Sequence, residues 1–131
     1  MIGPASYGDT LNGCHDDQPL PMRTRSGGTL WSVPYPQELN DIPMAMARRM
    51  DGKDFAQRII DNLAEMLDQT RAPDAPALVM GIALHPDIVG QPDRLRHLRR
   101  ALLAVAAARD AGQVWIATPG AIWRHAMALA Q

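Results

Sequence analysis

Apolar and polar positions alternate with a helical period in the middle of the chain. Apolar residues recur there at three- or four-residue spacing: Phe55, Ile59, Leu63, Met66 and Leu67. Asp51 precedes this stretch and is a typical N-cap residue, while Asp54 adds negative charge to the first turn. The pattern predicts a surface helix from about residue 51 to residue 69, with one buried face.

Two more helices are predicted in the last third of the chain. Pro92 is favourable at a first helical position, and a helix from there to about residue 111 has an apolar stripe: Leu95, Leu98, Leu102, Val105 and Ala106. Thr118 is a suitable cap for a last helix that opens with Pro119.

Short apolar segments separate these helices. Ala77–Leu84 is apolar without alternation, which is typical of a strand buried on both faces of a parallel sheet. Residues 114–117 and 29–33 are two further candidate strands. The order strand, helix, strand, helix, strand, helix predicts an α/β fold with a mostly parallel sheet that helices cover.

The first 50 residues are rich in glycine and proline, and we expect loops there. Residues 3–28 hold many turn formers, and a second loop is expected from Pro34 to Pro43. At 131 residues the chain is long enough for one domain and too short for two ordinary ones. We therefore expect a single domain over residues 1–131, with a loop-rich part up to residue 50 and a regular part from residue 51.

The net charge and the hydropathy of the chain bear on whether it binds nucleic acid or a membrane. Thirteen Lys and Arg residues against fourteen Asp and Glu residues give a net charge of −1, so no overall field favours nucleic acid or anionic lipid. The longest apolar runs have eight residues, against roughly 20 for a bilayer-spanning helix. These two observations predict no nucleic-acid or membrane partner, and a single cysteine with no visible secretory signal predicts a cytoplasmic protein.

His85 is a candidate catalytic residue because it directly follows the most apolar predicted strand. The strand ends that lead into helices form the active site in parallel α/β folds. An imidazole between the core and solvent suits general acid or base chemistry. A histidine that only hydrogen-bonds a loop carbonyl is an equally good interpretation of this position.

Other polar residues are weaker candidates. Asp16 and Asp17 lie beside a histidine and could orient it or hold a metal, but adjacent carboxylates usually solvate a turn. In the second loop, Glu38, Asn40 and Asp41 could position a polar substrate or serve only the turn itself.

A basic cluster lies on the predicted helix that begins at Pro92. It comprises Arg94, Arg96, His97, Arg99 and Arg100. Arg96 and Arg100 are four residues apart and share a face, so a phosphate-binding patch is conceivable. No glycine-rich phosphate loop or zinc-ligand spacing accompanies the cluster, and a solvated helix face is the favoured interpretation.

Four segments in order form a recognisable pattern. They are Asp16-Asp17-Gln18-Pro19, Val33-Pro34-Tyr35 with Glu38-Leu39-Asn40-Asp41, Gly81-Ile82-Ala83-Leu84-His85-Pro86 with Ile88-Val89-Gly90-Gln91-Pro92, and Val114-Trp115-Ile116-Ala117-Thr118. This pattern resembles the carboxy-terminal half of polysaccharide deacetylase-like proteins, and most of all their allantoinase-like branch. The family fold is a distorted, incomplete (β/α) barrel, so the resemblance implies the carboxy-terminal part of such a barrel.

The resemblance also implies an activity and roles. The family hydrolyses C–N amide bonds, either of N-acetyl groups on sugars or of linear or cyclic amides. His85 matches the late histidine, a general acid that protonates the leaving nitrogen. Asp16 or Asp17 matches an Asp-Asp pair of the allantoinase-like branch, and the loop with Tyr35, Glu38, Asn40 and Asp41 would shape the substrate pocket.

The chain also departs from the family pattern. The family's early Asp-Asp motif and its histidine pair, which supply the catalytic base and the ligands of a zinc-like divalent metal, have no match, and Ala83 replaces a usual leucine. We therefore expect a hydrolase fragment that is inactive alone and that needs a missing amino-terminal half or a homo-oligomer. The alternative is a non-catalytic half-barrel that serves as an association module.

Overall fold

The computed structural model describes residues 17–35 and 38–129, which fold as two compact units. The described part of the first unit comprises residues 17–35, 77–80 and 117–129, and that of the second comprises residues 38–76 and 81–116. The elements in chain order are β1 (Leu20–Arg23), β2 (Thr29–Ser32), the π-helical turn η1 (Pro43–Ala47), α2 (Gly52–Gln69), α3 (Pro86–Val89), α4 (Pro92–Asp110) and α5 (Pro119–Leu129).

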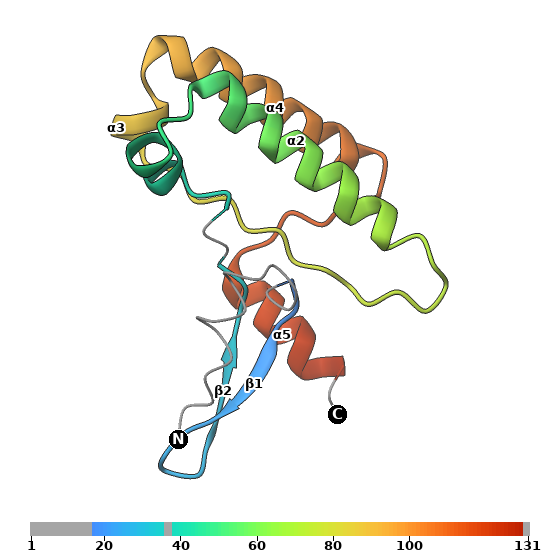
Figure 1. The fold of residues 1–131 in the computed structure, drawn as a ribbon. Coiled ribbons are helices and arrows are strands. Elements are labelled where there is room, and N and C mark those ends of the chain that lie inside the picture. The colour runs from blue at the N-terminus through green and yellow to red at the C-terminus, as the bar shows by residue number, and fades with distance from the viewer. Residues whose placement is uncertain (1–16, 36–37, 130–131) are drawn as a thin grey trace. The chain divides into compact units, whose positions relative to one another are not determined.

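The first unit contains an antiparallel hairpin of β1 and β2 (Figure 1). Its register places Leu20 opposite Ser32 and Arg23 opposite Thr29. Gly27 has φ +86° in the connecting turn, a conformation that glycine adopts without steric cost. The predicted strand over residues 29–33 is thus confirmed as β2, whereas the loop predicted over residues 3–28 is wrong where β1 forms.

The predicted terminal helix is confirmed as α5. The backbone N–H of Ala121 donates to the Thr118 hydroxyl oxygen at 3.3 Å, so Thr118 caps the helix as its residue type predicts. No residue of α5 is buried.

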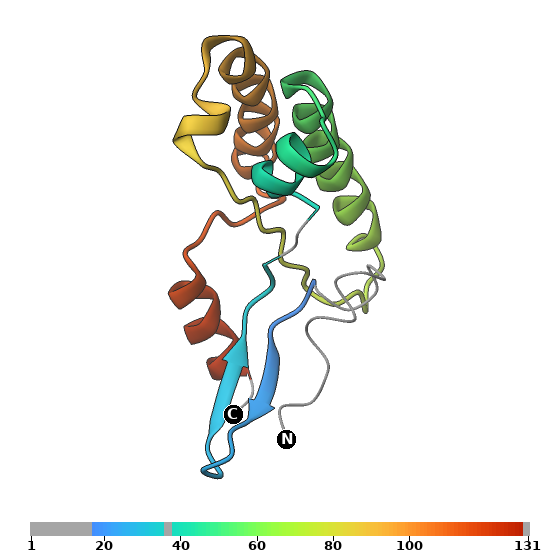
Figure 2. The ribbon, with the colours of Figure 1, turned by 60° about the vertical axis from the view of Figure 1, so that its left-hand side comes forward.

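The second unit is built on α2 and α4, which pack side by side (Figures 1 and 2). Gly52 at the start of α2 faces Arg94 near the start of α4, and Arg100 donates to Gln57 at 3.4 Å. The two helices therefore run in the same direction. Both lie within a residue or two of their predicted bounds, and the side chain of Asp51 caps α2 by accepting from the N–H of Asp54 at 2.8 Å.

The core of this unit lies between α2, α4 and the segment before α2 that contains Leu39 and Met44. Its buried apolar residues are Leu39, Met44, Phe55, Ala56, Ile59, Leu63, Met66, Val89, Leu98, Ala101 and Ala108. The apolar stripe predicted for α2 supplies four of them, Phe55, Ile59, Leu63 and Met66, which confirms its buried face. On α4 the stripe is only partly buried, because Leu102 stays exposed.

The predicted parallel sheet, and with it the barrel fragment, is wrong. Within residues 17–35 and 38–129, helices predominate and the one sheet is the antiparallel β1–β2 hairpin. Residues 77–84 have no regular secondary structure apart from a single parallel bridge, from Ala83 to Asn40, and residues 114–117 form no strand. An apolar run becomes a strand only where a second backbone lies alongside it at hydrogen-bonding distance, and composition cannot supply that neighbour.

Among the described helices, none combines the length and the apolar character that a membrane crossing requires.

Candidate functional site

The site is built around a buried carboxylate. Asp41 is only 2% exposed and directly follows Leu39 and Asn40, which are also buried. Leu39 anchors this segment in the core, and the side-chain oxygen of Asn40 accepts from the N–H of Ile42 at 3.0 Å. These contacts hold the backbone on both sides of Asp41 and thereby fix the position of its carboxylate.

A short parallel ladder brings Asp41 next to His85. The N–H of Ala83 donates to the carbonyl of Leu39 at 2.9 Å, and the N–H of Asp41 donates to the carbonyl of Ala83 at 3.2 Å. A regular parallel ladder would next pair the N–H of His85 with the carbonyl of Asp41. Instead, this N–H donates to Oδ2 of the Asp41 side chain at 2.7 Å. The carboxylate therefore ends the ladder in place of a backbone carbonyl.

The second oxygen of the same carboxylate holds the imidazole. Nδ1 of His85 lies 2.7 Å from Oδ1 of Asp41. A carboxylate oxygen accepts, so Nδ1 carries the proton in this bond and Nε2 is left as the nitrogen that can meet a substrate. The His85 side chain is 38% exposed, which leaves the ring within reach of molecules in solution.

His85 is also fixed from its carboxyl side. It is the N-cap residue of α3, and its carbonyl accepts from the N–H groups of Ile88 and Val89 at 2.9 and 3.0 Å. Pro86 occupies the first helical position, where its missing N–H costs nothing. The backbone of His85 is thus held on one side by α3 and on the other by Asp41.

A small cavity lies beside Asp41, at the N-terminal ends of α2 and α4. Its volume of about 10 Å³ is enough for roughly one water molecule. It is lined by Asp41, Met44, Ala45, Met50, Asp51, Gly52, Phe55, Ile88, Val89, Arg94 and Leu98. An organic substrate does not fit this cavity, so a substrate of His85 would approach from the exposed side of the ring.

The remaining predicted site residues that the structure describes are divided between the two units. Glu38 and Asn40 belong to the same unit as Asp41 and His85, and Asn40 is buried. Tyr35 and Asp17 belong to the first unit, where Tyr35 is exposed and the carbonyl of Asp17 accepts from the N–H of Val79. Asp16 lies outside the described residues.

The described residues do not fit the divalent metal of the resemblance. Asp41 and His85 direct the facing atoms of their side chains at each other, and the described ranges bring no group of three or more His, Cys, Asp or Glu side chains together. A zinc site needs at least three protein ligands. The Asp41–His85 pair is therefore a hydrogen-bonded dyad.

The pairing itself cannot be read from the sequence. His85 is predicted as an acid and Asp41 as a residue of the substrate loop, and neither has a predicted partner. The signal in the sequence is slight: Asp41 and His85 each lie one or two residues before a proline that opens a helical turn, Pro43 and Pro86. The segments around Asp41 and His85 are too short to reveal their mutual register without the fold.

Comparisons of the chain with protein-family models, with curated proteins and with solved structures yield no match. The resemblance to polysaccharide deacetylase-like proteins accordingly rests on the residues of this chain alone.

Proposed function

We propose that the chain carries the general-acid part of a hydrolase that cleaves non-peptide C–N amide bonds. The observation that supports this proposal is the bond between Asp41 and Nδ1 of His85, which orients a partly exposed imidazole. The pattern of residues around His85, which resembles polysaccharide deacetylase-like and allantoinase-like proteins, supports the choice of amide over other bonds.

The dyad can perform one defined step. After water adds to the amide carbon, the tetrahedral intermediate must expel an amine, which leaves poorly unless its nitrogen is protonated. The imidazolium of His85 would donate its Nε2 proton to that nitrogen as the C–N bond breaks, and the ring would end neutral. Asp41 keeps the Nδ1–H bond throughout, so the ring does not rotate out of line.

Activation of the attacking water is not assigned to any residue. The described residues offer no metal-ligand group near the dyad. We therefore propose that turnover requires groups beyond those described, supplied by another part of the protein or by a partner, and that the chain alone binds its amide without turning it over.

Binding is the property to measure first. Imidazole resonances of the full chain would be followed by NMR while an N-acetylated sugar oligomer, a linear amide or a cyclic amide is added. We expect one of these probes to shift the His85 resonances in the wild type, to shift them less in Asp41→Asn, and to leave the exposed His125 unchanged. If none of the three probes shifts His85 at millimolar concentration, the proposed function is wrong.

The alternative to a hydrolase is a non-catalytic association module. The exposed face of α4 favours this alternative independently of the dyad.

A further inference from the structure

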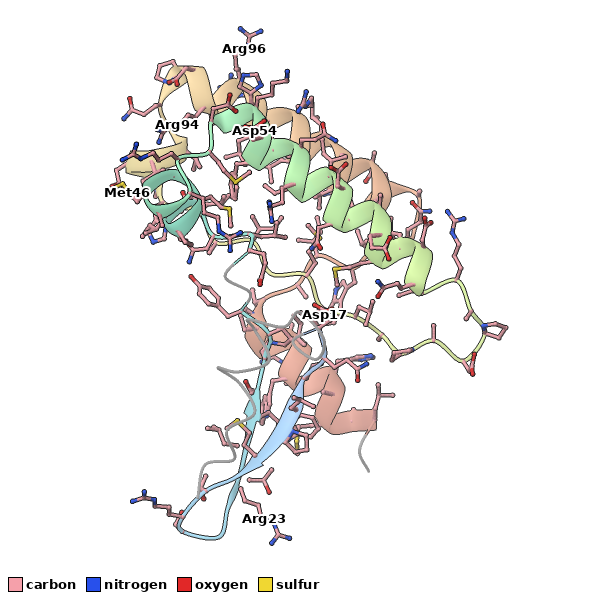
Figure 3. All side chains as sticks on the ribbon, viewed as in Figure 1. Asp17, Arg23, Met46, Asp54, Arg94 and Arg96 are labelled. Atoms are coloured by element: carbon pink, nitrogen blue, oxygen red, sulfur yellow. The ribbon has the colours of Figure 1, made fainter. Side chains whose placement is uncertain are left out.

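Helix α4 exposes one stripe along its whole length. The stripe consists of residues three or four positions apart: Arg96, Arg100, Leu103, Ala107 and Asp110. All five are exposed, and Leu103 is 69% exposed. Figure 3 shows Arg96 pointing away from the helix pair. The buried residues of the face that packs on α2 are others, namely Leu98, Ala101 and Ala108, although Arg100 of the stripe also donates to Gln57 of α2 at 3.4 Å.

The order of residues on the stripe is self-complementary. Arg96 and Asp110 lie seven residues before and seven residues after Leu103, so the stripe has a basic end, an apolar centre and an acidic end. If a second α4 runs antiparallel across it with the two Leu103 side chains in contact, each Arg96 faces an Asp110. Arg100 then faces the region of Ala107, a small residue that permits close approach of the two backbones.

Asp110 is available for such a pair. In the single chain it accepts from its neighbour Arg109 at 2.8 and 2.9 Å, and both bonds reach Oδ1. Oδ2 can therefore accept from Arg96 of another copy. Asp110 is also the last residue of α4, where the negative end of the helix dipole makes a carboxylate unfavourable. An arginine from an antiparallel copy would offset that cost.

We propose that the stripe Arg96–Arg100–Leu103–Ala107–Asp110 of α4 is a self-association surface at which two copies of this chain form a two-fold dimer. The contact is isologous, because each copy contributes the same patch. A single helix face is small for an interface, so the dimer is weak and its population depends on protein concentration and ionic strength. The proposal does not rest on the dyad or on the proposed hydrolase function.

Sedimentation velocity of the full chain over a range of protein concentrations tests the proposal. The wild type is expected to shift from monomer to dimer as concentration rises, and more so at low ionic strength. Leu103→Lys places two ammonium groups at the two-fold axis and should abolish the dimer. Met46→Lys removes another highly exposed apolar side chain of the same unit and should leave the dimer unchanged.

Charge-reversal variants distinguish the proposed antiparallel pairing from non-specific association. Arg96→Asp alone and Asp110→Arg alone each create like-charge pairs and should raise the dimer dissociation constant at least about tenfold. An equimolar mixture of the two variants restores both pairs and should form a heterodimer, which also shows that each variant is folded. Lys53→Asp serves as the charge control on α2.

The outcomes that would overturn the proposal are equally specific. A wild-type chain that stays monomeric at millimolar concentration, a dimer that Leu103→Lys leaves intact, or a variant mixture that associates no better than either variant alone contradicts the proposed surface.

Discussion

Both oxygens of the Asp41 carboxylate bind His85, a residue 44 positions further along the chain. One oxygen accepts from the backbone N–H and the other faces the imidazole, each at 2.7 Å. The same carboxylate therefore ends the backbone ladder and selects the orientation of the ring. The backbone pairing and the orientation of the imidazole therefore both depend on the Asp41 side chain.

Substitution of Asp41 should change the tautomer of His85. In Asp41→Asn the carboxamide can place its NH₂ group against Nδ1, which then becomes the acceptor, and the ring proton moves to Nε2. Long-range ¹⁵N–¹H correlation spectra of the neutral ring distinguish the two tautomers. An Nε2–H tautomer already present in the wild type would contradict the bond from Nδ1 to Asp41.

Substitution of Asp41 should also lower the free energy of unfolding. Asp41→Ala removes both acceptors and leaves the N–H of His85 without its partner, which we expect to cost about 1–3 kcal/mol. Asp41→Asn keeps an oxygen for that N–H and should cost less. Urea unfolding followed by circular dichroism measures both, and equal losses for the two variants would show that the backbone bond to Oδ2 contributes little.

Gly52 should resist any larger residue. A Cβ at this position would lie 2.8 Å from the Cα of Arg94, and a backbone atom cannot move aside as the tip of a side chain can. We expect Gly52→Ala to destabilise the chain by about 1–3 kcal/mol by forcing α2 and α4 apart. Gly120→Ala in α5 meets only the Arg124 guanidinium, at 3.7 Å, and should be neutral or slightly stabilising.

The α2–α4 contact should depend on Ile59. This side chain is completely buried, so Ile59→Ala leaves a cavity and should cost about 2–5 kcal/mol, whereas Ile59→Val should cost about 0.5–1.5 kcal/mol. Thermal and urea unfolding give these differences. Met46→Ala at an exposed position provides the control, and a comparable loss there would mean that the unfolding signal does not report this core.

The contribution of the Asp51 cap to stability should be measurable with single substitutions. Asp51→Ala removes the acceptor of the Asp54 N–H and is expected to cost about 0.5–2 kcal/mol. Asp51→Ser keeps a capping oxygen and should retain most of that stability. If Ser and Ala destabilise the chain equally, the side-chain bond is not what holds the first turn.

The helices could be predicted because their signals are local. Asp51, Pro92 and Thr118 mark helix starts by their own chemistry, and the hydrogen bonds of a helix join residues four apart. The apolar period of α2 likewise identified its buried face. These features require no knowledge of any distant segment.

The strands were predicted less well, since residues 29–33 were confirmed as β2 but the other two predicted strands were not. Residues 77–84 have the composition of a buried strand, yet within the described residues they form one β-bridge, at Ala83, and Val79 makes one backbone bond to Asp17. Residues 20–23 contain a proline and follow a run of turn formers, yet they pair with β2 across a tight turn. Strand formation depends on the neighbouring backbone, which composition does not encode.

The candidate site could likewise be predicted only in part. The sequence by itself determined that His85 stands at the end of an apolar segment, ahead of a proline-initiated turn, and it determined the helices that carry the rest of the unit. Only the tertiary structure decided that Asp41 is the partner of His85, because the pairing depends on the register of two short segments 44 residues apart. Local hydrogen bonds are encoded by neighbouring residues, whereas a register between distant segments exists only once the chain has folded.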